Sequence, residues 1–192
     1  VVNDIVNRFG LDEELSFPTW VNSSMALIAG ILAFIVGKNH KSVKSKTVWF
    51  VIAIASVLIS LDEVAALHEL LLQGLHILAD FGEGQGLLAN AWMIVAPIIL
   101  IGVILFVRLM HKQLPGDTFK NMAIALAVYM AGAFVVEYLS IPFDKSLIIY
   151  NFGAVVLEES LELVGVWLAI RAILVHINRH EKALNTNLLD LL

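Results

Sequence analysis

Five apolar stretches dominate this chain, and each approaches the roughly 20 residues that an α-helix needs to cross a ~30 Å hydrocarbon core. Apolar residues make up 59% of the sequence and charged residues 15%, whereas soluble domains average about 45–50% and about 25%. At 192 residues, one multi-helix bundle is the natural interpretation. The sequence predicts an all-α integral membrane bundle with five transmembrane helices, near residues 20–36, 47–67, 87–107, 122–139 and 147–170.

Basic residues are concentrated in alternate connectors of the predicted bundle. Lysines crowd the connector between the first two spans, and further basic residues follow the third and fifth spans, whereas the other loops are poor in them. By the positive-inside rule, the amino terminus lies outside and the carboxyl terminus is cytoplasmic. We expect one membrane domain over residues 1–192, in which 1–16 form an outer interfacial segment and 171–192 a cytoplasmic tail.

Several classes of site are excluded by what the chain lacks. There is no cysteine, which removes iron–sulfur clusters and thiolate zinc sites, so any metal needs oxygen and nitrogen ligands. A phosphate-binding loop and a dinucleotide fingerprint are missing, so no nucleotide cofactor is expected. No basic stripe with interleaved aromatic residues points to nucleic acid as a partner. Whether the protein is an enzyme stays open.

Ionisable residues interrupt three of the apolar stretches, although each costs at least ~2.5–3.5 kcal/mol at mid-bilayer. Counted from the cytoplasmic basic anchors at about 1.5 Å per residue, Asp62 lies ~24 Å up the second helix, Glu137 ~26 Å up the fourth and Glu159 ~18 Å up the fifth. Three helices thus carry acids to similar heights. The candidate site residues in and just beyond these stretches are Asp62, Glu63, His68, Glu69, Glu137, Glu158, Glu159 and Glu162.

The acids of the second and fifth spans also share helix faces. Asp62, Glu69 and His76 are seven residues apart and form one stripe, and the three glutamates at 158–162 fall within roughly 100° of one another. Such faces turn toward a protein interior or a wet cavity. No lysine or arginine lies at this depth, which argues against ordinary buried salt bridges. We expect a shared polar site, open toward the outer side, between the second, fourth and fifth helices.

A metal site is the first hypothesis for this cluster. Carboxylates from several helices with a histidine are chemically similar to the ligand sets of di-iron and di-manganese bundles, although the Glu-x-x-His pairs of those proteins are missing. We expect a divalent or di-metal centre of iron, manganese, zinc or copper, structural or redox, bound by Asp62, Glu63, Glu158, Glu159 and Glu162. His68, Glu69 and Glu137 would be further ligands or hold the ligands in place, and Glu137 can also snorkel to the outer interface.

Two alternatives use the same residues. Membrane carboxylates with raised pKa values serve proton relays and cation-coupled transporters, although the second span offers no polar continuation toward the cytoplasm. Alternatively, the polar cluster holds together an accessory or assembly subunit of a larger membrane complex. The expected partners are therefore the lipid bilayer and, in the last case, other membrane-protein subunits or a second copy of this chain.

Other polar residues have simpler interpretations. Four histidines, His40, His111, His176 and His180, lie in or beside basic stretches, and we expect them to be solvated. We expect Asn22 to be a helix-packing contact or to line a cavity, and Trp167 to be a packing or interface residue.

The stretches SLDEVAALHE, AGAFVVE and LEESLELVG, within about residues 60–165, resemble an uncharacterised family of bacterial polytopic inner-membrane proteins with the pattern SLDExxxxHE … LEExLELxG. The resemblance implies a multi-pass protein of the bacterial cytoplasmic (inner) membrane and no established activity. Its implied signature residues are the eight ionisable residues of the cluster together with Gly165.

Overall fold

The described part of the chain consists of helices packed side by side. In this computed structural model, residues 16–67, 70–71, 74, 92–136, 139 and 150–181 are described. The helices are α2 (Phe17–Asn39), α3 (Val43–Ala65), α5 (Trp92–Gln113), α6 (Gly116–Met130) and α8 (Val156–His180). Two π-helical segments extend them: η2 (Ala131–Val136) continues α6, and η3 (Tyr150–Val155) leads into α8. No strand occurs among these residues, which confirms the predicted all-α class for them.

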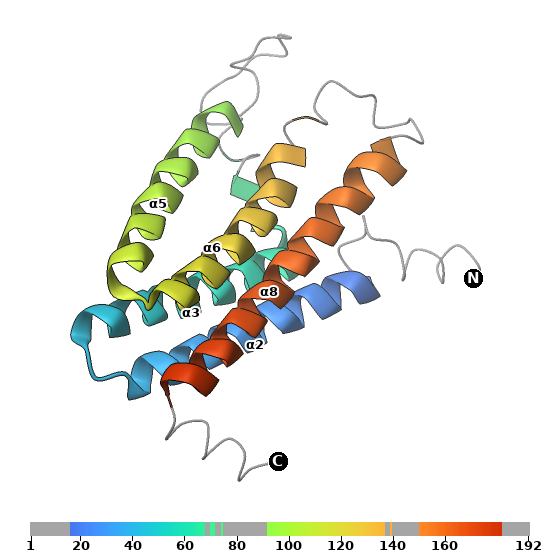
Figure 1. The fold of residues 1–192 in the computed structure, drawn as a ribbon. Helices are drawn as coiled ribbons and strands as arrows, with labels where there is room; N and C mark the ends of the chain where they lie inside the picture. Colours follow the sequence, from blue (N-terminus) through green and yellow to red (C-terminus); the bar gives the residue numbers. More distant parts are fainter. Residues whose placement is uncertain are drawn as a thin grey trace.

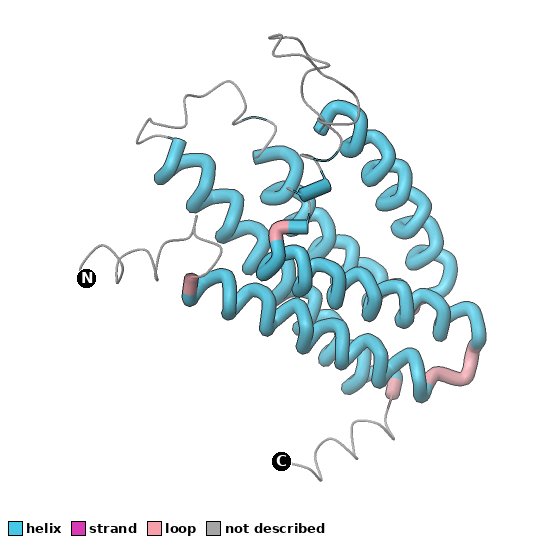
Figure 2. Tube along the Cα trace, turned by 180° about the vertical axis from the view of Figure 1, so that it is seen from behind, coloured by secondary structure: helices cyan, strands magenta, loops and turns pink. Residues whose placement is uncertain are grey.

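The helices alternate in direction, which sorts the polar residues to two ends (Figure 1). We call the end with His40, His176 and Glu181 the histidine end, and the opposite end, with Asp62 and the beginning of α8, the carboxylate end. α2 packs along α3, α6 packs along α8, and α2 also contacts α8, whereas α5 makes fewer contacts, at one side. Seen from behind in Figure 2, the same helices form one bundle.

Four helices among the described residues are long and apolar enough to cross a membrane: Phe17–Asn39, Val43–Ala65, Gly116–Val136 and Gly153–His180. Their outward faces carry large apolar side chains such as Phe34, Leu58 and Leu174. α5, at 22 residues, occupies the region of the remaining predicted span. Each of the five predicted spans thus corresponds to a helix, and four of these helices are long and apolar enough to cross a membrane.

The helices do not begin and end where the predicted spans do, because a helix can continue through polar residues beyond an apolar run. α6 begins at Gly116, after Leu114 and Pro115, so the polar sequence GDTFKN forms its first turns. α8 continues past Arg171 to His180, so the first part of the predicted cytoplasmic tail is helical. α5 ends later than expected for the same reason, since its last turn contains His111 and Lys112. Hydropathy locates the segment a bilayer could cover, whereas polar residues continue a helix into water.

The core toward the histidine end is built from closely packed apolar side chains. Trp49, Val36, Val48 and Ile173 are fully buried there, with Met110 from α5. α2 and α3 approach closely because Gly30 faces α3: a Cβ atom at this position would lie 3.0 Å from Val57 Cγ2 and 3.2 Å from the Ala53 carbonyl oxygen. Small residues at such an interface allow two backbones to pack tightly in a membrane.

A side-chain hydrogen bond joins α2 to α3. Ser23 Oγ donates to the Ser60 carbonyl oxygen at 2.9 Å and lies 3.0 Å from Ser60 Oγ. We expect Ser23→Ala to lower the free energy of unfolding by about 0.6–1.7 kcal/mol, the range measured for interhelical hydrogen bonds in membranes. Thermal unfolding in detergent, followed by circular dichroism, measures the change. Ser56→Ala is the control, and an equal loss in both variants would contradict a role for the Ser23 bond.

Candidate functional site

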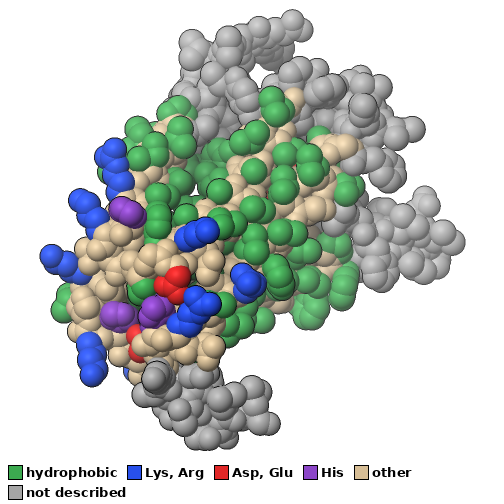
Figure 3. Space-filling view, in the orientation of Figure 1, with side chains coloured by type: hydrophobic (Ala, Val, Ile, Leu, Met, Phe, Trp, Pro, Cys, Tyr) green, Lys and Arg blue, Asp and Glu red, His purple; other side chains and the backbone are tan. Residues whose placement is uncertain are grey.

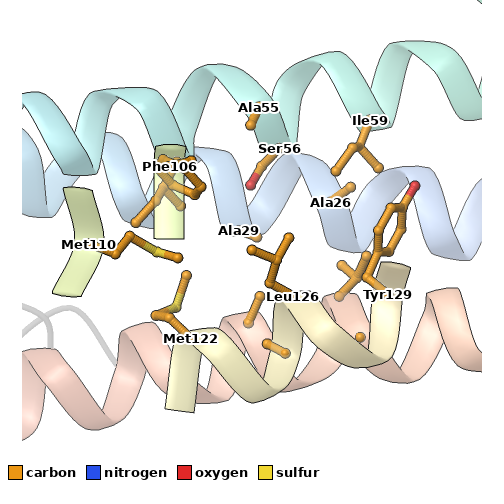
Figure 4. A pocket seen from close by; sticks show the side chains of 15 residues that line it. Ala26, Ala29, Ala55, Ser56, Ile59, Phe106, Met110, Met122, Leu126 and Tyr129 are labelled. Carbon is orange, nitrogen blue, oxygen red and sulfur yellow. The ribbon is translucent and has the colours of Figure 1, made fainter. Parts of the chain in front are cut away.

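Carboxylates of α3 and α8 act electrostatically on Tyr129 of α6. Asp62 and Glu63 on α3, and Glu159 and Glu162 on α8, all lie within electrostatic range of the Tyr129 side chain. The four acids are half-buried. Tyr129 extends from α6 across the bundle, with its hydroxyl on the side of α2 and α3 (Figure 4). We call Asp62, Glu63, Glu159 and Glu162 the carboxylate cluster. Acids from two helices that are distant in the sequence thus influence the same tyrosine electrostatically.

Glycines bring α6 against α8 at this level. A Cβ atom on Gly165 would lie 2.7 Å from both the backbone nitrogen and Cβ of Tyr129. A Cβ atom on Gly132 would lie 2.7 Å from the Glu158 carbonyl oxygen and 3.0 Å from Glu162 Cγ. Real Cβ atoms do not approach other atoms this closely, so these positions accept only glycine without a shift. The position of Tyr129 beside α8 depends on this approach.

A buried asparagine lies at the same level. Asn22 on α2 is 3% exposed, and neither its Oδ1 nor its Nδ2 has a hydrogen-bond partner. Its neighbour Ser23 bonds to Ser60, two residues before Asp62. One turn further along the same face of α2, Ala26 lines a cavity together with Tyr129. The register therefore places Asn22 at the level of Ser60 and Asp62 along the bundle. Sequence analysis had suggested packing or cavity lining for this residue.

The cavity continues from Tyr129 toward the histidine end. It has a volume of about 90 Å³ and extends to Met110 and Met122 (Figure 4). Among its lining residues only Ser56 and Tyr129 carry polar side-chain atoms. The space beyond the cluster is therefore apolar, which suits a closed cation site better than a polar path through the described part of the bundle.

The structure describes only one of the other expected ligands. Glu158 is half-buried near the beginning of α8. Each of the five expected carboxylate ligands that the structure describes takes part in at least one polar or electrostatic interaction. The remaining expected ligands, His68, Glu69 and Glu137, lie outside the described residues. The structure therefore does not place the one histidine that was expected in the cluster.

The histidine end contains a group that sequence analysis missed. His40, His176 and Glu181 each offer one ligand atom, and the three atoms lie within 4.8 Å of one another, close enough to hold a metal ion. The prediction that His176 is solvated is wrong, because its side chain is only 1% exposed. A signal existed in the sequence: His176 is three and four residues after Ile173 and Ala172, and so shares their buried face.

These features define a class of protein: a helical bundle with helices able to cross a membrane, a carboxylate cluster toward one end and a histidine–glutamate group at the other. The chain belongs to the family of a domain of unknown function, DUF8692, whose model matches residues 3–177. Comparison with the curated proteins and with the solved structures finds no similar protein. The family carries no functional description.

Proposed function

We propose that this protein is a multi-pass protein of the bacterial inner membrane that binds a divalent cation at the carboxylate cluster. The observation that carries the proposal is the Asn22 amide, which is buried at the level of the cluster with both polar atoms unpaired. Leaving such a group without a partner costs about 1–3 kcal/mol. Amide and carboxylate oxygens are ligands of hard divalent cations, so one bound ion would use both kinds of group.

The distribution of side chains supports the membrane location and the orientation. Hydrophobic side chains cover the middle of the visible face, and Lys, Arg and His side chains gather toward the histidine end (Figure 3). Cytoplasmic loops carry an excess of basic residues. The histidine end would therefore face the cytoplasm and the carboxylate cluster would lie nearer the outer side.

The chemistry of the described donors narrows the choice of cation. Asp62, Glu63, Glu159, Glu162 and Asn22 offer only oxygen atoms. Oxygen ligands suit magnesium, calcium and manganese, whereas zinc and copper favour added imidazole or sulfur. The sequence led us to expect iron, manganese, zinc or copper. Of these four metals, manganese fits the described oxygen donors best. A cation there would balance the negative charge that α3 and α8 bring together.

The test is a manganese titration of the protein purified in mild detergent and depleted of metal with a chelator. Loss of the electron paramagnetic resonance signal of free Mn²⁺ measures uptake. We expect about one equivalent in the wild type and at least a roughly tenfold weaker affinity in Glu162→Gln, because one charged ligand is lost. Glu181→Gln, at the opposite end, is the matched control. Absence of stoichiometric uptake by the wild type would contradict the proposal.

Asn22→Leu separates a cation ligand from a packing residue. Leucine removes two unpaired buried polar atoms, so we expect the metal-free protein to be equally stable or more stable, by up to about 1–3 kcal/mol. Manganese affinity should fall in the same variant because the amide oxygen is lost. Thermal unfolding of the metal-free protein and the titration are the two measurements. Unchanged affinity in Asn22→Leu would remove Asn22 from the site.

A further inference from the structure

The histidine end carries a second group of ligand-forming side chains, separate from the carboxylate cluster. His40 directly follows α2, His176 lies one turn before the end of α8, and Glu181 directly follows α8. His40 Nε2 and Glu181 Oε1 are 3.7 Å apart, and the ligand atoms of all three residues lie within 4.8 Å of one another. We propose that His40, His176 and Glu181 form a zinc-binding site.

The strongest support is the state of the His176 ring. The side chain is 1% exposed, and its Nδ1 lies 2.9 Å from the Thr118 hydroxyl oxygen. Its Nε2 is buried and has no hydrogen-bond partner. The rings of Trp49 and His180, with centroids 4.7 and 5.1 Å away, pack against the imidazole. The ring is thus held in place with one nitrogen satisfied and the other free to bind an ion.

Thr118 gives His176 the arrangement that metal-binding histidines usually have. Such histidines donate their second ring N–H to a nearby oxygen, which fixes the tautomer and the ring orientation. When Nδ1–H donates to Thr118 Oγ1, Nε2 presents its lone pair. Thr118 itself is 1% exposed, near the beginning of α6, so its hydroxyl has a fixed position. Three helices, α2, α6 and α8, therefore contribute to the site.

The other two ligands can adjust to the ion. The side chains of His40 and Glu181 are 21% and 20% exposed, at the opening of the site. Tetrahedral zinc, with bonds of about 2.0–2.2 Å, places its ligand atoms about 3.3–3.6 Å apart. These exposed side chains would thus close by about an ångström around the ion. The Ser42 N–H approaches His40 Nδ1 at 3.3 Å; zinc at Nε2 would place a proton on Nδ1 and end that long contact.

The donor set favours zinc and sets this site apart from the carboxylate cluster. Two imidazoles and one carboxylate are a known ligand set for zinc, with a fourth position left for water. Neutral imidazole suits zinc better than magnesium, calcium or manganese. The neighbouring Asp117 is already held by Arg179, at 3.0 Å, and by His180, at 3.1 Å, and so is not counted as a ligand. An ion here would join the end of α2 to the end of α8.

Water can reach this end of the bundle. The candidate span Gly153–His180, which joins the end of η3 to α8, has 28 residues, about 42 Å at 1.5 Å per residue, against a ~30 Å hydrocarbon core. The last turns of α8 therefore extend beyond the hydrocarbon when its beginning lies within it. Zinc would enter past His40 and Glu181 without crossing the apolar cavity.

Zinc titration of the metal-depleted full chain in detergent tests the site, with Co²⁺ as a spectroscopic probe for tetrahedral nitrogen and oxygen ligands. We expect the wild type to bind Zn²⁺, and His40→Ala and Glu181→Gln each to weaken binding at least tenfold. Both side chains are partly exposed, so these variants should fold. Thr118→Val should weaken Zn²⁺ binding by about 10–100-fold, the usual effect of removing a hydrogen bond to a ligand.

Two controls make the outcome unambiguous. His111→Ala removes an exposed histidine of the same end that is outside the group, and it should bind Zn²⁺ like the wild type. Glu162→Gln, in the carboxylate cluster, should also leave this Zn²⁺ site intact, so failure of the manganese site and failure of the zinc site are distinguished. Unchanged Zn²⁺ affinity in either His40→Ala or Glu181→Gln would overturn the three-ligand site.

Discussion

Trp49→Ala is expected to cause the largest loss of stability among single substitutions considered for this protein. Trp49 is 0% exposed and packs against the His176 ring with centroids 4.7 Å apart. Truncation of a buried tryptophan costs about 3–5 kcal/mol because it leaves a cavity that the surrounding side chains fill incompletely. We expect the lower end of this range, because in lipid or detergent the unfolded helix also keeps its apolar groups out of water.

Trp167→Ala is the matched control, since Trp167 is 53% exposed on the outer face of α8. Substitution of an exposed residue typically changes stability by no more than about 0.5 kcal/mol. Chemical or thermal unfolding in detergent, followed by circular dichroism rather than tryptophan fluorescence, compares the two variants. Equal losses would mean that Trp49 is not a core residue. Trp49→Ala should also weaken Zn²⁺ binding, because the His176 ring loses one of its packing partners.

Gly165→Ala is expected to separate α6 from α8. The added Cβ atom would lie 2.7 Å from the backbone nitrogen and 2.8 Å from Cα of Tyr129, and backbone atoms cannot rotate away as a side chain can. Overpacking of this kind costs about 1–3 kcal/mol. Because Tyr129 moves with α6, we also expect weaker manganese binding at the carboxylate cluster. Unfolding and titration of the same preparation measure the two effects.

Gly102→Ala provides a control with the opposite expected sign. Gly102 lies inside α5, and a Cβ atom there would meet no atom within 4 Å. Alanine favours a helix over glycine by about 1 kcal/mol, so this variant should be equally stable or more stable than the wild type. If Gly165→Ala behaved like Gly102→Ala, the close approach of α6 and α8 would be wrong.

The sequence signals at the carboxylate end are local. Apolar length predicted the helices, and the spacing of Asp62 and Glu63, and of Glu159 and Glu162, predicted one polar face on each helix. Counting residues from the basic anchors then placed these faces at similar heights. Tyr129 and Asn22 were not recognised as residues at the level of the acids, since a single tyrosine or asparagine in an apolar helix has no pattern of its own.

By itself, the sequence determined the helical class and the segments that a membrane could cover, because hydropathy and helical period depend on neighbours within a few turns. Only the tertiary structure decided that Gly165 seats Tyr129 against α8 and that His40 meets His176 and Glu181. Those contacts join residues from different helices, and they depend on how closely and at which register the helices pack. A histidine in a basic stretch therefore looks solvated in the sequence, although the packing of α2, α6 and α8 buries His176.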